Sequence, residues 1–225
     1  MKYFILANGE GKRWGNHLGI PKQLIEIDGE TILHRMIRLL KQEGVEATDI
    51  FICGDLPDEN AYTLPTKSKT KREVFEEIAK LAKEPFTILY GDCYYTEDCI
   101  HEIVNRPICE FDEFFTTKPN PYTGCPWGEG YAHRCVKWKW WRDSMHKLNS
   151  ELDLGHIKLD TERDWFIHWW LLGARDKEEL ERPVIQDYDL RHDVEWLDET
   201  DDFDYPEDLD LFCKTTGHKC TNRAA

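Results

Sequence analysis

The chain has 225 residues, of which 40% are hydrophobic and 12% aromatic, so it is long and apolar enough to bury a core. It carries 44 acidic and 29 basic side chains, a net charge of −15, and this balance argues against a non-specific nucleic-acid surface. No run approaches the roughly 20 apolar residues of a membrane span, and the N-terminus does not resemble a secretory signal. We therefore expect one cytoplasmic globular domain over residues 1–225, with no membrane or nucleic-acid partner.

Strand-like and helical segments alternate through the first half. Short apolar runs predict buried strands at residues 3–7, 49–53, 86–90 and 111–117. Helical spacing of apolar residues predicts helices over residues 32–40, 70–82 and 100–104. At the start of the second helix, Thr70 and Glu73 resemble a capping box. The alternation predicts an α/β fold, in which a mostly parallel twisted sheet is flanked by helices in a Rossmann-like arrangement.

The second half is less regular. Residues 118–150 are rich in proline, glycine, tryptophan and basic groups and show no clean period, whereas residues 160–172 read as a tryptophan-heavy helix. Interior packing or a subunit contact explains that helix better than a ligand-binding face. We expect residues 118–190 to be an elaborated region that binds a small acceptor molecule or forms a homodimer contact.

The eight cysteines are interpreted as reduced thiols, because the chain is too large to need disulfides and lacks an export signal. Two sets can bring three metal ligands together: Cys213 and Cys220 with His218, and Cys125 and Cys135 with His133. Neither set has the Cys-x-x-Cys spacing that is typical of a structural zinc site, so zinc is the disfavoured alternative.

A basic, glycine-rich loop stands out against this acidic background: the stretch LANGEGKRWGNHLGIPKQL, which runs from residue 6 to residue 24. It lacks the third glycine of the dinucleotide fingerprint, since Trp14 occupies that position. It also lacks the Ser or Thr of a P-loop, since Arg13 follows Lys12. What remains is a strand, a glycine turn that carries Arg13, and Pro21-Lys22 before a strand expected at residues 23–27.

This arrangement resembles the nucleotidyltransferases of the glycosyltransferase-A type. Their signature, Leu-Ala-x-Gly-x-Gly-x-Arg followed after a gap by Pro-Lys-x-Leu, matches residues 6–13 and 21–24. Two further family elements match Ile88-Leu89-Tyr90-Gly91-Asp92 and the acidic run at residues 202–209. The chain departs from the family at Asn8, where a small residue is usual, and residues 118–190 resemble no family member.

The resemblance implies the fold and an enzyme that joins a nucleoside triphosphate to a phosphorylated acceptor. It implies a nucleotide-binding set of Leu6, Ala7, Asn8, Gly9, Gly11, Arg13 and Lys22. It implies catalytic roles for Arg13, Lys22 and Asp92, and a Mg²⁺ or Mn²⁺ cofactor held by Asp92 and Asp204, with Asp202 as a further ligand.

The chemistry of these residue types is consistent with those roles. Backbone N–H groups at Gly9 and Gly11 can approach a triphosphate closely, and the Arg13 guanidinium can bind phosphate oxygens in a fork. We expect Arg13 to bind the departing pyrophosphate and Lys22 to neutralise the α-phosphate. For Asp204 two other interpretations stay open, a helix cap and a solvated acidic surface.

A sugar phosphate is the acceptor that we rank first. The aromatic stretch Trp127–Trp141 holds Arg134, Lys137 and Lys139, so it can bind a sugar phosphate, cage a quaternary ammonium such as phosphocholine, or simply form core. A cytidylyltransferase acting on an amino-alcohol phosphate is thus one alternative. A glycosyltransferase that uses a nucleotide sugar and a non-catalytic nucleotide-binding protein are the others.

Overall fold

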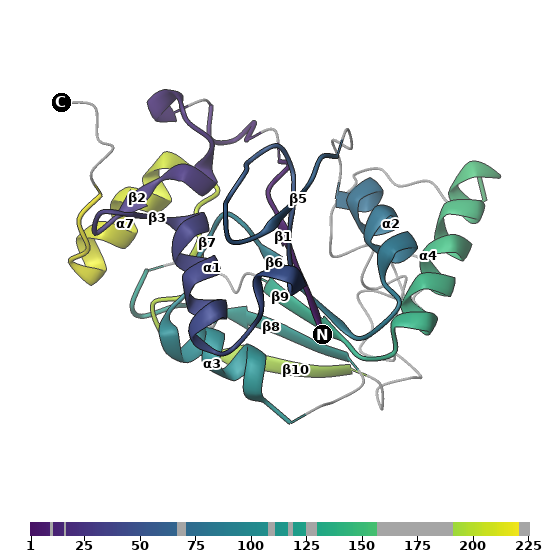
Figure 1. The fold of residues 1–225 in the computed structure, drawn as a ribbon. Coiled ribbons are helices and arrows are strands. Elements are labelled where there is room, and N and C mark those ends of the chain that lie inside the picture. Colours follow the sequence, from purple (N-terminus) through teal and green to yellow (C-terminus); the bar gives the residue numbers. More distant parts are fainter. Residues whose placement is uncertain are drawn as a thin grey trace.

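A computed structural model of the chain describes residues 1–9, 11–15, 17–66, 71–107, 111–116, 119–124, 130–156 and 191–220. Its centre is a seven-stranded sheet with the order β10-β8-β9-β6-β1-β4-β5 (Figure 1). In chain order the strands are β1 (Lys2–Leu6), β4 (Ile50–Cys53), β5 (Tyr62–Leu64), β6 (Phe86–Tyr90), β8 (Phe111–Thr116), β9 (Gly130–Cys135) and β10 (Arg191–Trp196). Among these seven, β9 alone runs antiparallel to its neighbours. The expected mostly parallel α/β sheet is confirmed.

Five α-helices in the described part of the chain surround this sheet. Helices α1 (Ile32–Gln42) and α3 (Glu97–Asn105) lie on one face, and α2 (Lys71–Leu81) and α4 (Trp138–Asp153) on the other (Figure 1). The fifth, α7 (Pro206–Thr216), lies beyond α1. The short elements are η1 (His17–Gly19), η2 (Lys22–Leu24), η3 (Ala47–Asp49) and the strand pairs β2 (Glu26–Ile27) with β3 (Glu30–Thr31) and β7 (Cys93–Tyr94) with β11 (Asp201–Asp202). None of the helices within the described ranges has the length and apolarity that a membrane crossing requires.

The main core lies between the sheet and its helices. All five side chains of β6 are buried, as expected for a central strand covered on both faces. On the face of α2 and α4, the Trp141 ring lies edge-on to Phe75 and Phe86, with ring centroids 5.8 and 5.1 Å away. Trp141 is therefore a packing residue, and the core interpretation of the aromatic stretch is correct at this position.

A second, smaller core joins α7 to the start of the chain. It comprises Trp14, Ile25, Ile27, Ile32, Tyr94, Phe203, Leu209, Phe212 and Cys213. The hairpin of β2 and β3 turns at Asp28 and Gly29, whose φ values of 54° and 84° fit a type I′ turn. Ile27 forms an isolated bridge with Cys220. Residues near both ends of the chain are thus packed together.

The sequence predictions hold best for the apolar runs. The strand at residues 86–90 is confirmed to the residue, and the helix predicted over residues 32–40 is confirmed as α1. The strand predicted at residues 23–27 is wrong in part, because the 3₁₀ turn η2 precedes a two-residue strand. The patterns missed α4, β9 and β5 altogether. The capping residue Thr70 and the helix predicted over residues 160–172 lie outside the described residues.

Candidate active site

The carboxyl ends of β1 and β6 meet at the centre of one sheet edge, and glycines allow the close approach. Leu6 pairs with Tyr90 in the parallel register, and the Gly91 N–H donates to the Leu6 carbonyl oxygen at 2.9 Å. A Cβ atom at Gly91 would collide with that carbonyl. Asp92 therefore follows β6 at the sheet edge where open α/β folds bind ligands.

The glycine loop after β1 is anchored by a buried tryptophan, Trp14. Gly11 has a φ of +57°, a backbone conformation that disfavours side chains, and its carbonyl accepts from the Gly15 N–H at 3.1 Å. Trp14 is 2% exposed, and its Nε1 donates to the His17 carbonyl at 3.0 Å. Space around Gly9 is open, since an added Cβ would meet nothing within 4 Å. The loop thus presents backbone to solvent while its indole is anchored.

The remaining residues of the expected nucleotide-binding set lie at the foot of this loop. The side chains of Leu6 and Ala7 are buried in the main core, so only their backbone groups remain for contacts at the loop. Asn8 is partly buried. Its role as the residue that departs from the family pattern stays a prediction.

Lys22 is the centre of the ionic cluster. The turn η2 places this side chain inside the protein, 8% exposed, although lysines are rarely buried without partners. Its Nζ lies 3.2 Å from Asp92 Oδ2 and 3.4 Å from Asp204 Oδ1. Three residues predicted from separate parts of the sequence are thus brought together.

The electrostatics of Lys22 follow from these partners. Burial disfavours its charge, but the carboxylates of Asp92 and Asp204 outweigh that effect and raise the pKa of Lys22 above its ordinary value. The Asp202 carboxylate acts in the same direction from β11, whose register pairs Asp202 with Cys93. Lys22 is therefore charged throughout the physiological range.

Asp204 also pairs with a second basic side chain, Arg13. The Arg13 guanidinium forms an ion pair with Asp204 Oδ2, although the Arg13 side chain is 60% exposed. Arg13 also lies over the Tyr205 ring, 5.8 Å from its centroid. Asp204 is not the cap of α7, because Tyr205 is the residue at that position and its N–H donates to the Asp208 carboxylate at 2.6 Å. The helix-cap interpretation of Asp204 is wrong.

Lys71 also belongs to this site, and sequence reasoning missed it. It is the first residue of α2, and its Nζ lies 4.0 Å from the centroid of the Tyr90 ring. Burial lowers the pKa of Lys71, and the charges of Asp92, Asp202 and Asp204 oppose that shift. The capping-box pattern beside Lys71 pointed only to a helix start, so no signal marked this residue as functional.

Within the ranges described, no group of three His, Cys, Asp or Glu side chains is arranged to hold a metal ion. Two carboxylates, Asp92 and Asp204, nevertheless converge on the same ammonium from different elements. Mg²⁺ commonly uses one or two protein carboxylates and takes its other ligands from phosphate oxygens and water. The donor set at the site fits that pattern.

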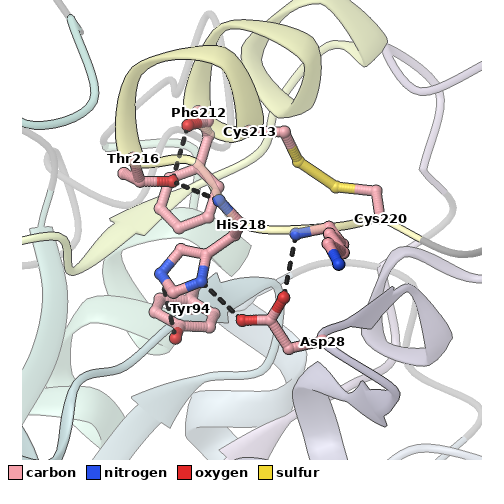
Figure 2. The surroundings of a disulfide bond; sticks show 8 residues. Asp28, Tyr94, Phe212, Cys213, Thr216, His218 and Cys220 are labelled. Carbon is pink, nitrogen blue, oxygen red and sulfur yellow. Dashed lines mark hydrogen bonds and ion pairs between the residues drawn. A yellow bond between two sulfur atoms is a disulfide. The ribbon is translucent and has the colours of Figure 1, made fainter.

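The structure corrects the prediction of reduced thiols at the C-terminal end. Cys213 and Cys220 form a disulfide, with Cα atoms 6.8 Å apart (Figure 2). Their sulfur atoms are therefore not zinc ligands. His218 lies beside them, with Nδ1 2.6 Å from Asp28 Oδ2 and Nε2 2.9 Å from Glu199 Oε2. The other cysteine set includes Cys125, which lies outside the described residues.

Part of the expected acceptor region has a structural role. Arg134 is 1% exposed, and its guanidinium pairs with the buried Asp112 carboxylate. It also donates to the carbonyl oxygens of Arg106 and Pro107 at 2.9 Å. The prediction that Arg134 can bind an acceptor phosphate is wrong, since its donors fix the end of α3 instead. Most of residues 118–190, Trp127 included, lie outside the described residues.

Solved structures with this fold are known, although no family model and no curated sequence matches the chain. A candidate glucose-1-phosphate thymidylyltransferase from Bacillus anthracis, solved with sucrose, superposes with a TM-score of 0.62 at 13% identity, over 96% of this chain and 95% of that one. HddC from Yersinia pseudotuberculosis, complexed with GMP-PN, gives 0.56 at 14% identity, over 96% and 98%. The inositol-1-phosphate CTP transferase from T. maritima gives 0.56 at 14%, over 95% of each chain. The chain has the fold of these transferases.

Proposed function

We propose that the protein is a nucleotidyltransferase that transfers a nucleoside monophosphate from a nucleoside triphosphate to a sugar phosphate and releases pyrophosphate. The observation that carries this proposal is the convergence of Arg13, Lys22, Asp92 and Asp204 at the carboxyl ends of β1 and β6. The fold similarity to transferases named for glucose 1-phosphate and inositol 1-phosphate supports the reaction class and the acceptor class.

The loop after β1 would hold the triphosphate. Open backbone around Gly9 and the turn at Gly11 let N–H groups reach phosphate oxygens, and the exposed Arg13 would bind the departing pyrophosphate. Lys22, fixed by two carboxylates, would neutralise the α-phosphate as it is attacked. No covalent nucleophile is required, because positioning and charge stabilisation supply most of the catalysis of such a displacement.

Mg²⁺ or Mn²⁺ would be held by Asp92 and Asp204, with Asp202 next to them. When bound, the ion would offset the repulsion between the two phosphates that must meet. In the structure the basic side chains of Arg13 and Lys22 form ion pairs with oxygens of these carboxylates. The basic side chains that would bind phosphate and the carboxylates that would hold the metal are thus adjacent in the same cluster.

The aromatic cage for phosphocholine loses support, because Trp141 and Tyr131 are buried in the core. A glycosyltransferase has no evident use for the pair of Arg13 and Lys22, and a non-catalytic nucleotide-binding protein has no need of the converging carboxylates. The homodimer, the cytoplasmic location and the roles of residues 118–190 stay predictions.

The proposal is tested by incubating the protein with Mg²⁺, each of the four nucleoside triphosphates and a panel of sugar 1-phosphates, inositol 1-phosphate and phosphocholine. We expect pyrophosphate release that requires both a triphosphate and a sugar phosphate. Cleavage of a nucleotide sugar without any triphosphate, or no release with any pair, would overturn it. Release with phosphocholine alone would move the acceptor to the amino-alcohol class.

A further inference from the structure

Lys71 is held in a fixed position by an aromatic platform. Its Nζ lies 4.0 Å from the centroid of the Tyr90 ring, within the range of a cation–π contact. That ring is itself locked, because Tyr90 Oη is hydrogen-bonded to Nε2 of the buried His133 at 2.9 Å. The two rings also meet edge-on, with centroids 5.4 Å apart. The contact thereby holds a flexible, partly buried lysine side chain in one position.

Lys71 and Lys22 reach the same group of carboxylates from elements on different faces of the sheet. Tyr90 is two residues before Asp92, and Lys71 interacts electrostatically with Asp92, Asp202 and Asp204. Lys22 reaches Asp92 from η2, which packs against α1. Lys71 comes from α2, which packs against α4 on the other face of the sheet (Figure 1). The carboxylates thus interact with two ammonium groups that are anchored by different elements.

The reaction needs two phosphates at this site. An oxygen of the acceptor phosphate forms a bond to the α-phosphorus, the bond from that phosphorus to the bridging oxygen breaks, and its electron pair leaves with pyrophosphate. The attacking oxygen and the departing pyrophosphate lie on opposite sides of the α-phosphorus, in line. Arg13 and Lys22 are assigned to the triphosphate, which leaves the attacking phosphate in need of a cation of its own.

We propose that Lys71, seated on Tyr90, binds the phosphate group of the acceptor and aims its oxygen at the α-phosphorus. This inference rests on the proposed function and names the residue that recognises the acceptor. Burial lowers the pKa of Lys71, so an incoming dianion would supply the counter-charge that favours its charged form. Lys71 is thus a catalytic residue for the acceptor half of the site, matched by Lys22 for the donor half.

The test compares the binding of two inorganic probes, phosphate for the acceptor half and pyrophosphate for the triphosphate half, by titration calorimetry. Loss of one charge-assisted contact should weaken binding by about tenfold or more. We expect Lys71→Gln to weaken phosphate binding by that factor and pyrophosphate binding less than about twofold, and Arg13→Gln to do the reverse. Lys71→Arg should restore phosphate binding.

Lys80→Gln is the matched control, because Lys80 lies on the same helix, exposed and paired with Glu76 at 2.7 Å. It should change neither affinity. Unchanged phosphate affinity in a folded Lys71→Gln protein, equal losses for both probes, or no saturable phosphate binding by the unaltered protein would overturn the inference. If the unaltered protein binds both probes but transfers no nucleotide to any acceptor, the proposed function fails separately.

Discussion

Gly91 is the residue on which the placement of Asp92 depends. Because an added Cβ would collide with the Leu6 carbonyl, Gly91→Ala must push β6 away from β1. We expect a loss of about 2–4 kcal/mol in the free energy of unfolding, measured by urea denaturation. Gly130→Ala is the control, since a Cβ there meets nothing within 4 Å, and it should change stability by less than about 0.5 kcal/mol. Equal effects of the two substitutions would contradict this account.

Lys22 carries the largest catalytic expectation. Removing its ammonium deprives the α-phosphate of its cation and leaves the carboxylates of Asp92 and Asp204 facing each other. We expect Lys22→Ala to lower kcat by about a hundredfold or more in a pyrophosphate-release assay. Lys12→Ala, at an exposed position on the same loop, should retain most of the activity. A folded Lys22→Ala protein of normal kcat would remove Lys22 from the mechanism.

Single residues also mark the limit of what the sequence predicts. Arg13, Lys22 and Asp92 were predicted because each belongs to a recognisable motif that contains glycine or proline. Lys71 and His133 have no such context: one begins a helix and the other lies in a strand, and the partner that gives each its place, Tyr90, is distant in sequence. Contacts of this kind depend on how strands and helices pack, which local patterns do not encode.

At the scale of elements, a disulfide links Cys213 near the end of α7 to Cys220, and Cys220 forms a β-bridge with Ile27 of the β2–β3 hairpin. The end of α7 is thereby connected to the hairpin. A crosslink over this short loop lowers the conformational entropy of the unfolded chain, which stabilises the folded protein by about 2 kcal/mol. We expect Cys213→Ser with Cys220→Ser, or treatment of the native protein with a dithiol, to lower the free energy of unfolding by that amount. Identical urea curves with and without the dithiol would argue against the crosslink.

The contacts between the residues after α7 and the hairpin predict that stability depends on pH. The Lys219 N–H, donating to the Asp28 carboxylate at 2.9 Å, lowers the pKa of Asp28, and His218 acts in the same direction. A depressed carboxyl pKa contributes stability above the unfolded value of about 3.9 that is lost as the pH falls through the lower folded value. Between about pH 5 and 3, the Tm of the unaltered protein should fall more steeply than that of Asp28→Asn. Parallel Tm profiles would contradict this prediction.

Helices and strands differ in how well the sequence predicts them. The strand at residues 86–90 is a continuous apolar run, and α1 has one apolar face, so period and burial agree. Strand β9 has the sequence Gly-Tyr-Ala-His-Arg-Cys. Its polar side chains are buried against partners from other strands, as Arg134 is against Asp112 of β8. Its burial depends on a partner strand, and no periodicity within β9 reveals that. The crosslink was missed because chain length and expected compartment say nothing about two particular cysteines.

At the scale of the whole molecule, ligand binding should stabilise the fold. A triphosphate with Mg²⁺ would connect the loop after β1, the end of β6 and the segment before α7. At 100 times Kd, binding adds about 2.7 kcal/mol to the free energy of unfolding. We expect the preferred triphosphate to raise the Tm in the presence of Mg²⁺ or Mn²⁺, and much less with a chelator or in Asp92→Asn. A full rise in the chelated protein would contradict the metal assignment.

The joining of residues from both halves of the chain at one cluster has a consequence for biosynthesis. Lys22 and Arg13 emerge from the ribosome early, whereas Asp204 and Cys220 follow about two hundred residues later, after most of the sheet. During that interval the two cations lack the carboxylate that pairs with both of them. The cluster is therefore complete only once the segment before α7 has been synthesised and has packed against the start of the chain.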